Sequence, residues 1–485
     1  MYLGIDLGTT NVKAALYDSD MNLVDRKSAP VGYIRDEGHV EFDAEEYYSV
    51  LLDLIGSVLE SNGIKRIDEM AFTGQAETLV CLGKDGRPLI NAISWMDERS
   101  VSECAELSEK FPQKLCREVT GQQAVLPTWP ATKILWLRRN MPDVFDNVAT
   151  YMLLKDYIVF RLTGSMFCDM SIATFSFYFD IYNKCYWKEM LDAIGIDESR
   201  LPELIEPCSY AGDILPEEAG RIGLEGSARI NCGTLDHFAG MIGTGNISGG
   251  GITLSTGTVM ALTVMSAEPA PKEGPIAMHY GFIPDTHIML PVVESGGVSL
   301  EWFRRSCMGG SDYDEMNRVL SDRGGNGIIF LPYIVGTNSP EFDSDASGMF
   351  WGLRQEHDRF DMARAVMEGV SFVLRKNTET IAGQGTGLTS IIATGGGAKS
   401  DIWCALQADI TGLPVRIPAE KEAACLGAAM IAAVDDGRFG SFGEAVEKCV
   451  SFVKTFEPHP SPETERKYRQ FCALYRASVE AARIE

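Results

Sequence analysis

Apolar residues at the start of the chain alternate with short polar turns, as they do in β-hairpins. The runs Tyr2–Asp6 and Val12–Tyr17 are separated by a polar turn, and a further run covers Leu23–Arg26. The next strand is expected over Glu69–Thr73, after a segment with helical spacing. Strands and helices alternate in this way along the chain, which predicts an α/β fold. The expected helical face consists of Tyr47, Leu51, Leu54, Ile55 and Val58, behind Asp43 as a cap.

The middle of the chain repeats the pattern of its beginning. Residues 243–251 are rich in glycine, and Ile252–Leu262 then again predicts a strand, a Gly-Thr turn and a second strand. Because this hairpin resembles the opening one, we expect two related lobes, residues 1–245 and 246–485. The apolar segment Ala423–Val434 predicts a buried helix in the second lobe.

Composition narrows the class of protein. Of the 485 residues, 45% are hydrophobic and 23% are charged, which is typical of globular chains. The net charge of -25 disfavours nucleic acid and anionic membranes as partners. The cysteines form no C-x-x-C pair, and the opening residues have no secretory pattern. No apolar stretch reaches the roughly 20 residues of a membrane span. We therefore expect a cytoplasmic protein without membrane contacts, and the sequence leaves a homodimer open.

Three glycine-containing loops follow predicted strands. They are Asp6–Thr10, Ser255–Thr258 and Ala393–Ser400. Exposed backbone N–H groups in such turns can hold phosphate oxygens, and the carboxylate of Asp6 could hold Mg²⁺. Each loop alone is equally explained as an ordinary turn. Together the loops favour a nucleotide-binding protein, whereas an NAD-dependent dehydrogenase lacks the expected glycine fingerprint.

Asp236 is the most distinctive acidic residue. It follows a predicted strand, Ala228–Cys232, and a glycine turn, where a general base could take a proton from an attacking hydroxyl. The alternative is a cap for a helix over Phe238–Ile242. The segments 75–77 and 95–99 combine carboxylates with an indole, which suits a polyhydroxylated ligand. For the second segment, a salt-bridged surface turn is the alternative.

Several motifs together resemble the FGGY carbohydrate kinases. Gly348–Leu353 followed by Asp361–Glu368 is similar to the family's C-terminal signature, and Leu331–Tyr333 and Gly395–Ser400 lie in the expected order. The resemblance implies two lobes of the actin/Hsp70/hexokinase-like (ribonuclease H-like) α/β ATPase fold with an interlobe cleft. It also implies phosphorylation of a small sugar or polyol, with ATP and Mg²⁺ as cofactors.

The resemblance further implies roles for individual residues. Asp236 corresponds to the family's catalytic base, and Asp6 to the acidic residue near Mg²⁺ and phosphate, so both are expected at the metal. The implied nucleotide contacts are Thr9, Thr10, Asn11 and Lys13 in the first lobe and Gly257, Thr258, Gly297, Glu301, Gly396 and Ser400 in the second. The implied substrate contacts are Ala76, Glu77, Trp95, Asp97 and Trp129, with Lys133 nearby.

The resemblance leaves the substrate open. Lys155–Tyr157 and Asp169–Ser171 look most like the xylulokinases of the family, so a ketopentose such as D-xylulose is expected first. Ala76 and Glu77, however, replace the Met-His pair usual there, and Glu77 is shared with glycerol kinases. The alternatives are a polyol such as glycerol, erythritol or a pentitol, or another ketose. A non-catalytic ATP switch on the same fold is the rival from another class, and the pocket residues count against it.

Overall fold

The computed structural model describes residues 1–268, 270–310 and 312–482, which form two compact units. Unit 1 comprises Met1–Ile247, Ala277–Ile288 and Glu422–Val450. Unit 2 comprises Ser248–Ile276, Met289–Lys421 and the chain from Ser451 onward. The first crossing point lies near the boundary expected from the sequence. The chain then returns to unit 1 twice, which a division into two contiguous halves does not represent.

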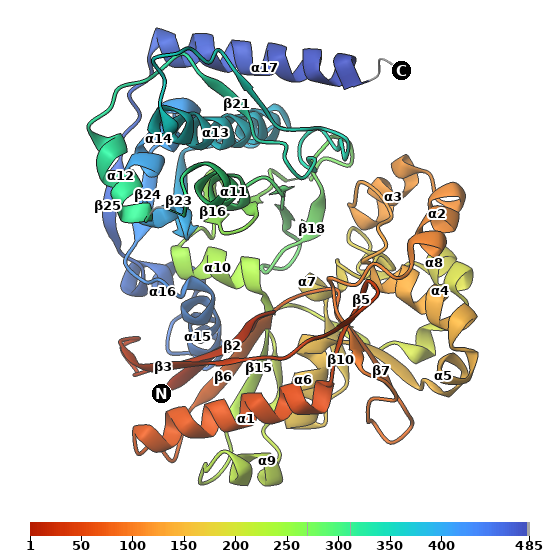
Figure 1. Ribbon diagram of the computed structural model, residues 1–485. Helices are drawn as coiled ribbons and strands as arrows, with labels where there is room; N and C mark the ends of the chain where they lie inside the picture. Colours follow the sequence, from red (N-terminus) through yellow and green to blue (C-terminus); the bar gives the residue numbers. More distant parts are fainter. Residues whose placement is uncertain (269, 311, 483–485) are drawn as a thin grey trace. The chain divides into compact units, whose positions relative to one another are not determined.

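The main sheet of unit 1 has the strand order β14-β15-β6-β1-β2-β3 (Figure 1). β1 pairs with β2 as the predicted antiparallel hairpin and runs parallel to β6, which in turn runs parallel to β15. The carboxyl ends of β1, β6 and β15 therefore meet at one edge of the sheet, where ligands bind in many α/β folds. The strands are β1 (Tyr2–Leu7), β2 (Asn11–Tyr17), β3 (Leu23–Pro30), β6 (Glu69–Gly74), β14 (Tyr210–Asp213) and β15 (Arg229–Leu235).

Helices cover both faces of this sheet. Leu3 and Ile5 of β1 lie in one apolar core with the inner face of α1 (Ala44–Ser61), which Asp43 caps as predicted. Gly4 points to the opposite face, because side chains alternate along a strand. A Cβ on Gly4 would lie 1.9 Å from the carbonyl oxygen of Cys425, so α15 (Ala423–Asp435) packs directly on β1. This close packing explains why residues from late in the sequence belong to unit 1.

A second sheet of unit 1 has the order β4-β5-β8-β7-β9 and carries several short helices. Its strands are β4 (Ile34–Asp36), β5 (His39–Phe42), β7 (Leu79–Leu82), β8 (Ala92–Ile93) and β9 (Thr150–Leu153). The remaining helices of unit 1 as a whole are α2 (Val101–Lys110), α3 (Gln113–Thr120), α4 (Pro130–Asn140), α5 (Pro142–Asn147), α6 (Leu154–Thr163), α7 (Met170–Ala173), α8 (Lys188–Ile194), α9 (Pro216–Arg221), α10 (Asp236–Thr244) and α16 (Phe442–Cys449). Short pieces complete the unit: β10 (Phe167–Asp169), β11 (Phe179–Asp180), β12 (Cys185–Tyr186), β13 (Glu203–Ile205), β18 (Met278–Tyr280) and a 3₁₀ turn at Glu198–Arg200.

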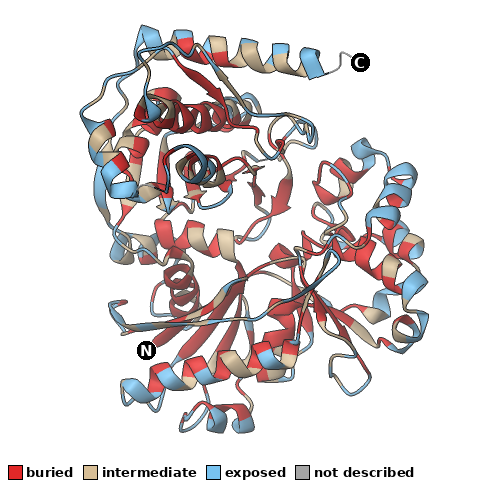
Figure 2. Ribbon diagram, in the orientation of Figure 1, coloured by how far each residue is buried: buried red, intermediate tan, exposed pale blue. Residues whose placement is uncertain are grey.

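Unit 2 repeats the hairpin arrangement of unit 1. β16 (Gly251–Thr256) pairs with β17 (Met260–Met265) as an antiparallel hairpin and runs parallel to β23 (Ser390–Gly395). Figure 2 shows α13 (Arg359–Gly383) as the most deeply buried helix of this unit. The other elements are β20 (Val292–Val293), β21 (Ile329–Leu331), β22 (Met349–Trp351), β24 (Val415–Pro418), β25 (Phe452–Phe456), α11 (Gly297–Cys307), α12 (Tyr313–Ser321), α14 (Asp401–Thr411), α17 (Pro462–Ala482) and a 3₁₀ turn at Gly397–Lys399. β19 (His287–Met289) begins in unit 1 and ends with the first residue of the next unit 2 segment.

Candidate active site

Asp6 and Asp236 lie at the carboxyl edge of the main sheet of unit 1. Asp6 is near the end of β1, and Asp236 directly follows β15. Burial, together with the negative charge of Asp236, raises the pKa of Asp6 to about 7. The ammonium of Lys13 lies 3.7 Å from Asp6 and 2.7 Å from Glu422, and it is shared between those two carboxylates. The edge therefore carries more negative than positive charge.

These oxygen donors fit a hard cation such as Mg²⁺. That ion is commonly held through one or two carboxylates, with water and phosphate oxygens completing its shell. Within residues 1–268, 270–310 and 312–482, no group of three or more His, Cys, Asp or Glu side chains could hold a metal alone. A cation beside Asp6 would accordingly take ligands other than these side chains, such as water and phosphate oxygens.

A β-bulge places Asp236 at the sheet edge. The register of β15 against β6 shifts between Asn231 and Thr234, and Gly233 there has a φ of +65°. A Cβ on Gly233 would lie 1.6 Å from the carbonyl oxygen of Phe72, so this position requires glycine. The strand consequently continues past the predicted end at Cys232 and reaches Leu235.

α10 begins at Asp236, two residues earlier than predicted. Leu235 occupies the N-cap position, and no side chain caps the helix there. The alternative role of Asp236 as a capping residue is therefore wrong. One carboxylate oxygen of Asp236 accepts a hydrogen bond from the backbone N–H of His237 at 2.6 Å.

The β1–β2 turn is held by side chains from elsewhere in unit 1. The carbonyl of Gly8 accepts hydrogen bonds from the Tyr47 hydroxyl at 3.0 Å and the Gln75 amide at 3.4 Å. The indole N–H of Trp95 donates to the Thr9 hydroxyl at 2.9 Å. Thr10 is exposed, and Asn11 and Lys13 are half-buried. The structure thus brings the expected phosphate turn and the expected substrate residue Trp95 into contact.

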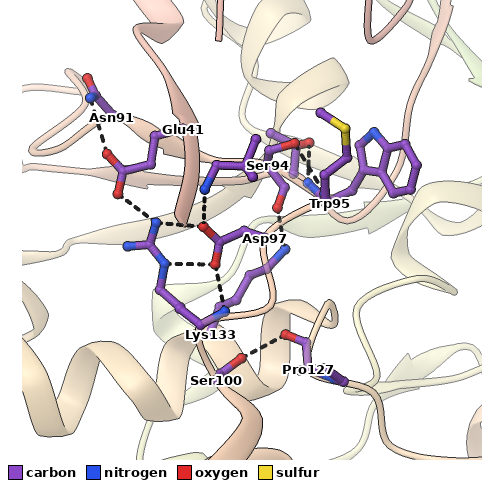
Figure 3. Close-up of polar contacts among 12 residues, drawn as sticks. Glu41, Asn91, Ser94, Trp95, Asp97, Ser100, Pro127 and Lys133 are labelled. Carbon is purple, nitrogen blue, oxygen red and sulfur yellow. Dashed lines mark hydrogen bonds and ion pairs between the residues drawn. The ribbon is translucent and has the colours of Figure 1, made fainter. Parts of the chain in front are cut away.

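The half-buried Glu77 and the buried Lys133 form a polar pair beside this turn. Glu77 has a φ of +62°, and burial raises the pKa of its carboxyl, whereas the Lys133 ammonium and the Thr128 hydroxyl act in the opposite sense. Lys133 is fully buried and donates to the carbonyls of Ser94 at 2.8 Å and Glu77 at 3.3 Å (Figure 3). The half-buried Ala76 precedes Glu77 in the same loop.

Asp97 forms an interior ion pair, in contrast to the surface turn considered as its alternative. It is fully buried and pairs with Arg99, whose guanidinium also reaches Glu41. The carboxylate further accepts the backbone N–H of Val40 at 2.6 Å (Figure 3). Both oxygens of Asp97 are thus occupied by the protein. Trp95, by contrast, is 39% exposed.

Trp129, an expected substrate contact, lies in an aromatic cluster. Its ring packs against Phe175 and Phe177, and its indole N–H donates to the Ala124 carbonyl at 3.3 Å. His279 stacks on Phe175 with ring centroids 4.5 Å apart, and burial lowers the pKa of this histidine to about 3. Sequence reasoning missed His279, because nothing local indicates that its segment belongs to unit 1.

Unit 2 contains a cavity of about 440 Å³ at the turn of its own hairpin. Gly297 is required there, since a Cβ on it would lie 2.3 Å from the Gly257 carbonyl oxygen. Ser400 caps α14 and donates to the Asn317 side chain at 2.7 Å. The cavity wall includes every unit 2 residue expected at the nucleotide: Gly257, Thr258, Gly297, Glu301, Gly396 and Ser400.

Glu301 is the charged residue of that group, and its neighbours balance its charge. Arg304 donates to both of its carboxylate oxygens at 2.8 and 2.9 Å, and the Tyr313 hydroxyl donates at 2.7 Å. These hydrogen bonds lower the pKa of Glu301 to about 2. The cavity wall also includes Asp314 and Lys399. Its charged side chains are therefore of both signs, whereas the edge of unit 1 carries mainly acidic ones.

Sequence profiles of two domains match the chain. The N-terminal domain of the FGGY family of carbohydrate kinases matches residues 1–243, and the C-terminal domain of that family matches residues 252–435. The chain belongs to the FGGY family of carbohydrate kinases. It is accordingly a sugar phosphotransferase, as the motifs predicted. The described residues include no helix that is long and apolar enough to cross a membrane.

Individual relatives extend over almost the full length. The chain is 32% identical to a xylulose kinase of Lactococcus lactis over 98% of its own length and 95% of that protein. It is 26% identical to a gluconokinase of Bacillus subtilis over 98% of its length and 94% of that protein. The structure of a xyloylose kinase from Brucella ovis matches with a TM-score of 0.91 and 29% identity, covering 98% of this chain and 99% of that one. The expected actin/hexokinase-like fold class is confirmed.

Proposed function

We propose that the protein transfers the γ-phosphoryl group of ATP to a hydroxyl of a ketopentose such as D-xylulose. The observation that carries this proposal is the position of Asp236 directly after β15, where its charge acts on Asp6 at the same sheet edge. Phosphoryl transfer needs a carboxylate at the nucleophile and charge compensation at the phosphates. The carboxyl edge of the main sheet of unit 1 provides the carboxylate.

In this reaction Asp236 accepts the proton of the attacking hydroxyl. The N–H groups of the turns after β1 and β16 hold phosphate oxygens, and Lys13 compensates part of their charge. Asp6 would hold Mg²⁺, which when bound neutralises charge on the phosphate oxygens. The cavity of about 440 Å³ in unit 2 accommodates the nucleoside part of ATP. Trp95 and Glu77 orient the sugar.

The charges around Asp6 favour a neutral sugar over an anionic one. Asp6, Asp236 and Glu77 are acidic, and the buried ammonium of Lys133 already donates to two backbone carbonyls. A sugar acid would bring a further negative charge, which like charges disfavour. This consideration supports xylulose, the substrate in the name of the Lactococcus lactis relative, over gluconate, named in the Bacillus subtilis one. A neutral polyol stays the second candidate.

The test is an assay of ADP release by the purified protein with MgATP and single sugars. We expect turnover with D-xylulose to exceed that with glycerol, erythritol, pentitols and gluconate by at least about tenfold in kcat/KM. A preferred polyol would change the substrate while leaving the kinase reaction in place. Steady ADP formation independent of any sugar would instead contradict the proposal and favour an ATP switch.

A further inference from the structure

A cluster of three charged side chains lies in the interior of unit 1, behind the strand that carries Asp236. Lys155, Asp156 and Asp169 are each fully buried. The Lys155 ammonium lies 3.0 Å from Asp156 and 3.2 Å from Asp169, and it donates to the backbone carbonyl of Cys232 at 2.8 Å. A buried ion pair stabilises a protein only weakly, because removing its charges from water is costly. Its presence here calls for another explanation.

The cluster is connected to the two residues before Asp236. Asp169 accepts a hydrogen bond from the Ser171 hydroxyl at 2.9 Å. The oxygen of that hydroxyl accepts in turn from the Thr234 hydroxyl at 2.8 Å and from the backbone N–H of Leu235 at 3.2 Å. One ion pair followed by hydrogen bonds therefore connects Lys155 to the end of β15. We refer to Lys155, Asp169, Ser171 and Thr234 as the buried relay.

The relay binds β15 where the pairing of this strand with β6 is interrupted. The regular pairing of β15 with β6 is interrupted between Asn231 and Thr234 by the bulge at Gly233. Cys232 and Leu235, the residues on either side of the bulge and of Thr234, are the ones whose backbone groups Lys155 and Ser171 bind. Side chains thus fix the irregular end of the strand, and with it the position from which Asp236 projects.

We propose that Lys155, Asp169, Ser171 and Thr234 are positioning residues for phosphoryl transfer, which they support by holding the end of β15 so that Asp236 stays aligned with its substrate. This inference rests on the proposed role of Asp236 as general base. The residues act through the backbone, and none of them contacts a reacting atom. Misplacement of a catalytic group by about 1 Å can lower a rate by roughly 10²-fold. The relay should therefore affect kcat far more than the binding of either substrate.

The sharpest variants are Ser171→Ala, Thr234→Val and Lys155→Met. We expect Ser171→Ala to lower kcat by about 10- to 100-fold, with KM for ATP within twofold of wild type. Thr234→Val keeps the shape of the side chain without its hydroxyl and should lower kcat less. Thr234→Ser retains the hydroxyl and should restore kcat to within about twofold. Ser171→Ala and the two Thr234 variants keep the test valid if Lys155→Met does not fold.

Lys467→Met is the matched control for Lys155→Met. Lys467 is also buried and pairs with Glu368, but it lies in unit 2. If the relay positions the base, both variants lower the melting temperature and only Lys155→Met lowers kcat. Equal kcat values in Lys155→Met and Lys467→Met, or an unchanged kcat in Ser171→Ala, would overturn the inference.

A double variant separates this inference from the proposed function. In a protein that already carries Asp236→Asn, Ser171→Ala should not lower the residual rate further, because the aligned base is absent. An additive loss would show that Ser171 acts by another route and would overturn the relay. If Asp236→Asn alone retained full activity, the proposed base would be wrong, whatever the relay variants do.

Discussion

The hairpins β1–β2 and β16–β17 have the same backbone arrangement but differ in the charge of their side chains. Each is an antiparallel pair whose first strand also runs parallel to a later strand. Asp6 stands two residues before the turn glycine of the first hairpin, and Ser255 stands at the same place in the second. Lys13, which pairs with Asp6 across the first hairpin, likewise corresponds to Ala261, which pairs with Ser255 across the second. The frame thus provides a turn for phosphate in both units, whereas charged side chains lie on the hairpin itself only in unit 1.

Both frames depend on a glycine at the end of the parallel strand. A Cβ on Gly74 would lie 2.6 Å from the Cβ of Leu7, and one on Gly395 would lie 2.7 Å from the carbonyl oxygen of Thr256. The two positions are equivalent by register, since Leu7 pairs with Gly74 and Thr256 with Gly395. The comparison therefore predicts that unit 1 variants affect the chemical step and unit 2 variants affect the nucleotide.

The largest effect is expected for Asp236→Asn. Asparagine keeps the shape of the side chain but cannot take the proton, and a positioned general base contributes about 10²–10⁴-fold to a rate. We expect kcat to fall by that factor, while ATP binding measured by calorimetry stays close to wild type. More than about a tenth of the activity in a folded variant would contradict the role of Asp236.

In unit 2, Gly297→Ala should weaken the binding of ATP alone. A Cβ at this position would lie 2.3 Å from the carbonyl oxygen of Gly257, so the turn after β16 must move away from α11. We expect KM for ATP to rise by about tenfold or more, with KM for the sugar unchanged. Gly249→Ala is the matched control, because a Cβ there would meet no atom within 4 Å. A sugar-specific defect in Gly297→Ala would break the division between the units.

Glu77→Gln should lower kcat/KM for the sugar and leave KM for ATP unchanged. An ionised carboxylate only accepts hydrogen bonds, so Glu77 suits a pair of substrate hydroxyls. Loss of one such buried, charged partner lowers kcat/KM by roughly ten- to a hundredfold. Steady-state kinetics with each substrate varied in turn would measure this. Unchanged sugar kinetics would remove Glu77 from the substrate pocket.

The pair Ala76→Met with Glu77→His tests the same pocket from the other side. It installs the Met-His pair usual in xylulokinases, and the imidazole can donate a hydrogen bond to a carbonyl oxygen. If D-xylulose is not already the preferred sugar, its kcat/KM should rise relative to the polyols. A ratio that does not change would argue that this loop does not select the substrate.

Local patterns in the sequence sufficed to predict both hairpins, whereas the residues expected at the unit 2 cavity followed from the resemblance to the FGGY kinases. The hairpins could be predicted because a strand, a glycine turn and a second strand are close together in the chain. The bulge at Gly233 could not be predicted, since it depends on contact with Phe72. The contact between Gly4 and Cys425 and the link from Lys155 to Cys232 also join distant residues. Packing of this kind decides which segments form a unit, and no local pattern indicates it.

The smallest effect of a substitution is expected at the first residues of the parallel strands β6 and β23. Glu69 in β6 corresponds by register to Ser390 in β23, because they pair with Tyr2 and Gly251 at the starts of β1 and β16. Glu69 is fully buried, and burial raises its pKa to about 8, although Arg229 lies 2.9 Å away and acts in the opposite sense.

The carboxyl group of Glu69 therefore binds its proton more tightly in the folded protein than in the unfolded chain, where glutamates titrate near pH 4.3. The resulting contribution to the free energy of unfolding is complete below that pH and is lost as the pH rises to about 8. In Glu69→Gln, the decrease in melting temperature between pH 5 and pH 8 should be smaller by a few degrees. Ser390→Ala should not alter this pH dependence, since serine does not titrate there. An unchanged slope in Glu69→Gln would show that Arg229 keeps Glu69 ionised, and the buried charge of unit 1 would then extend along the whole strand.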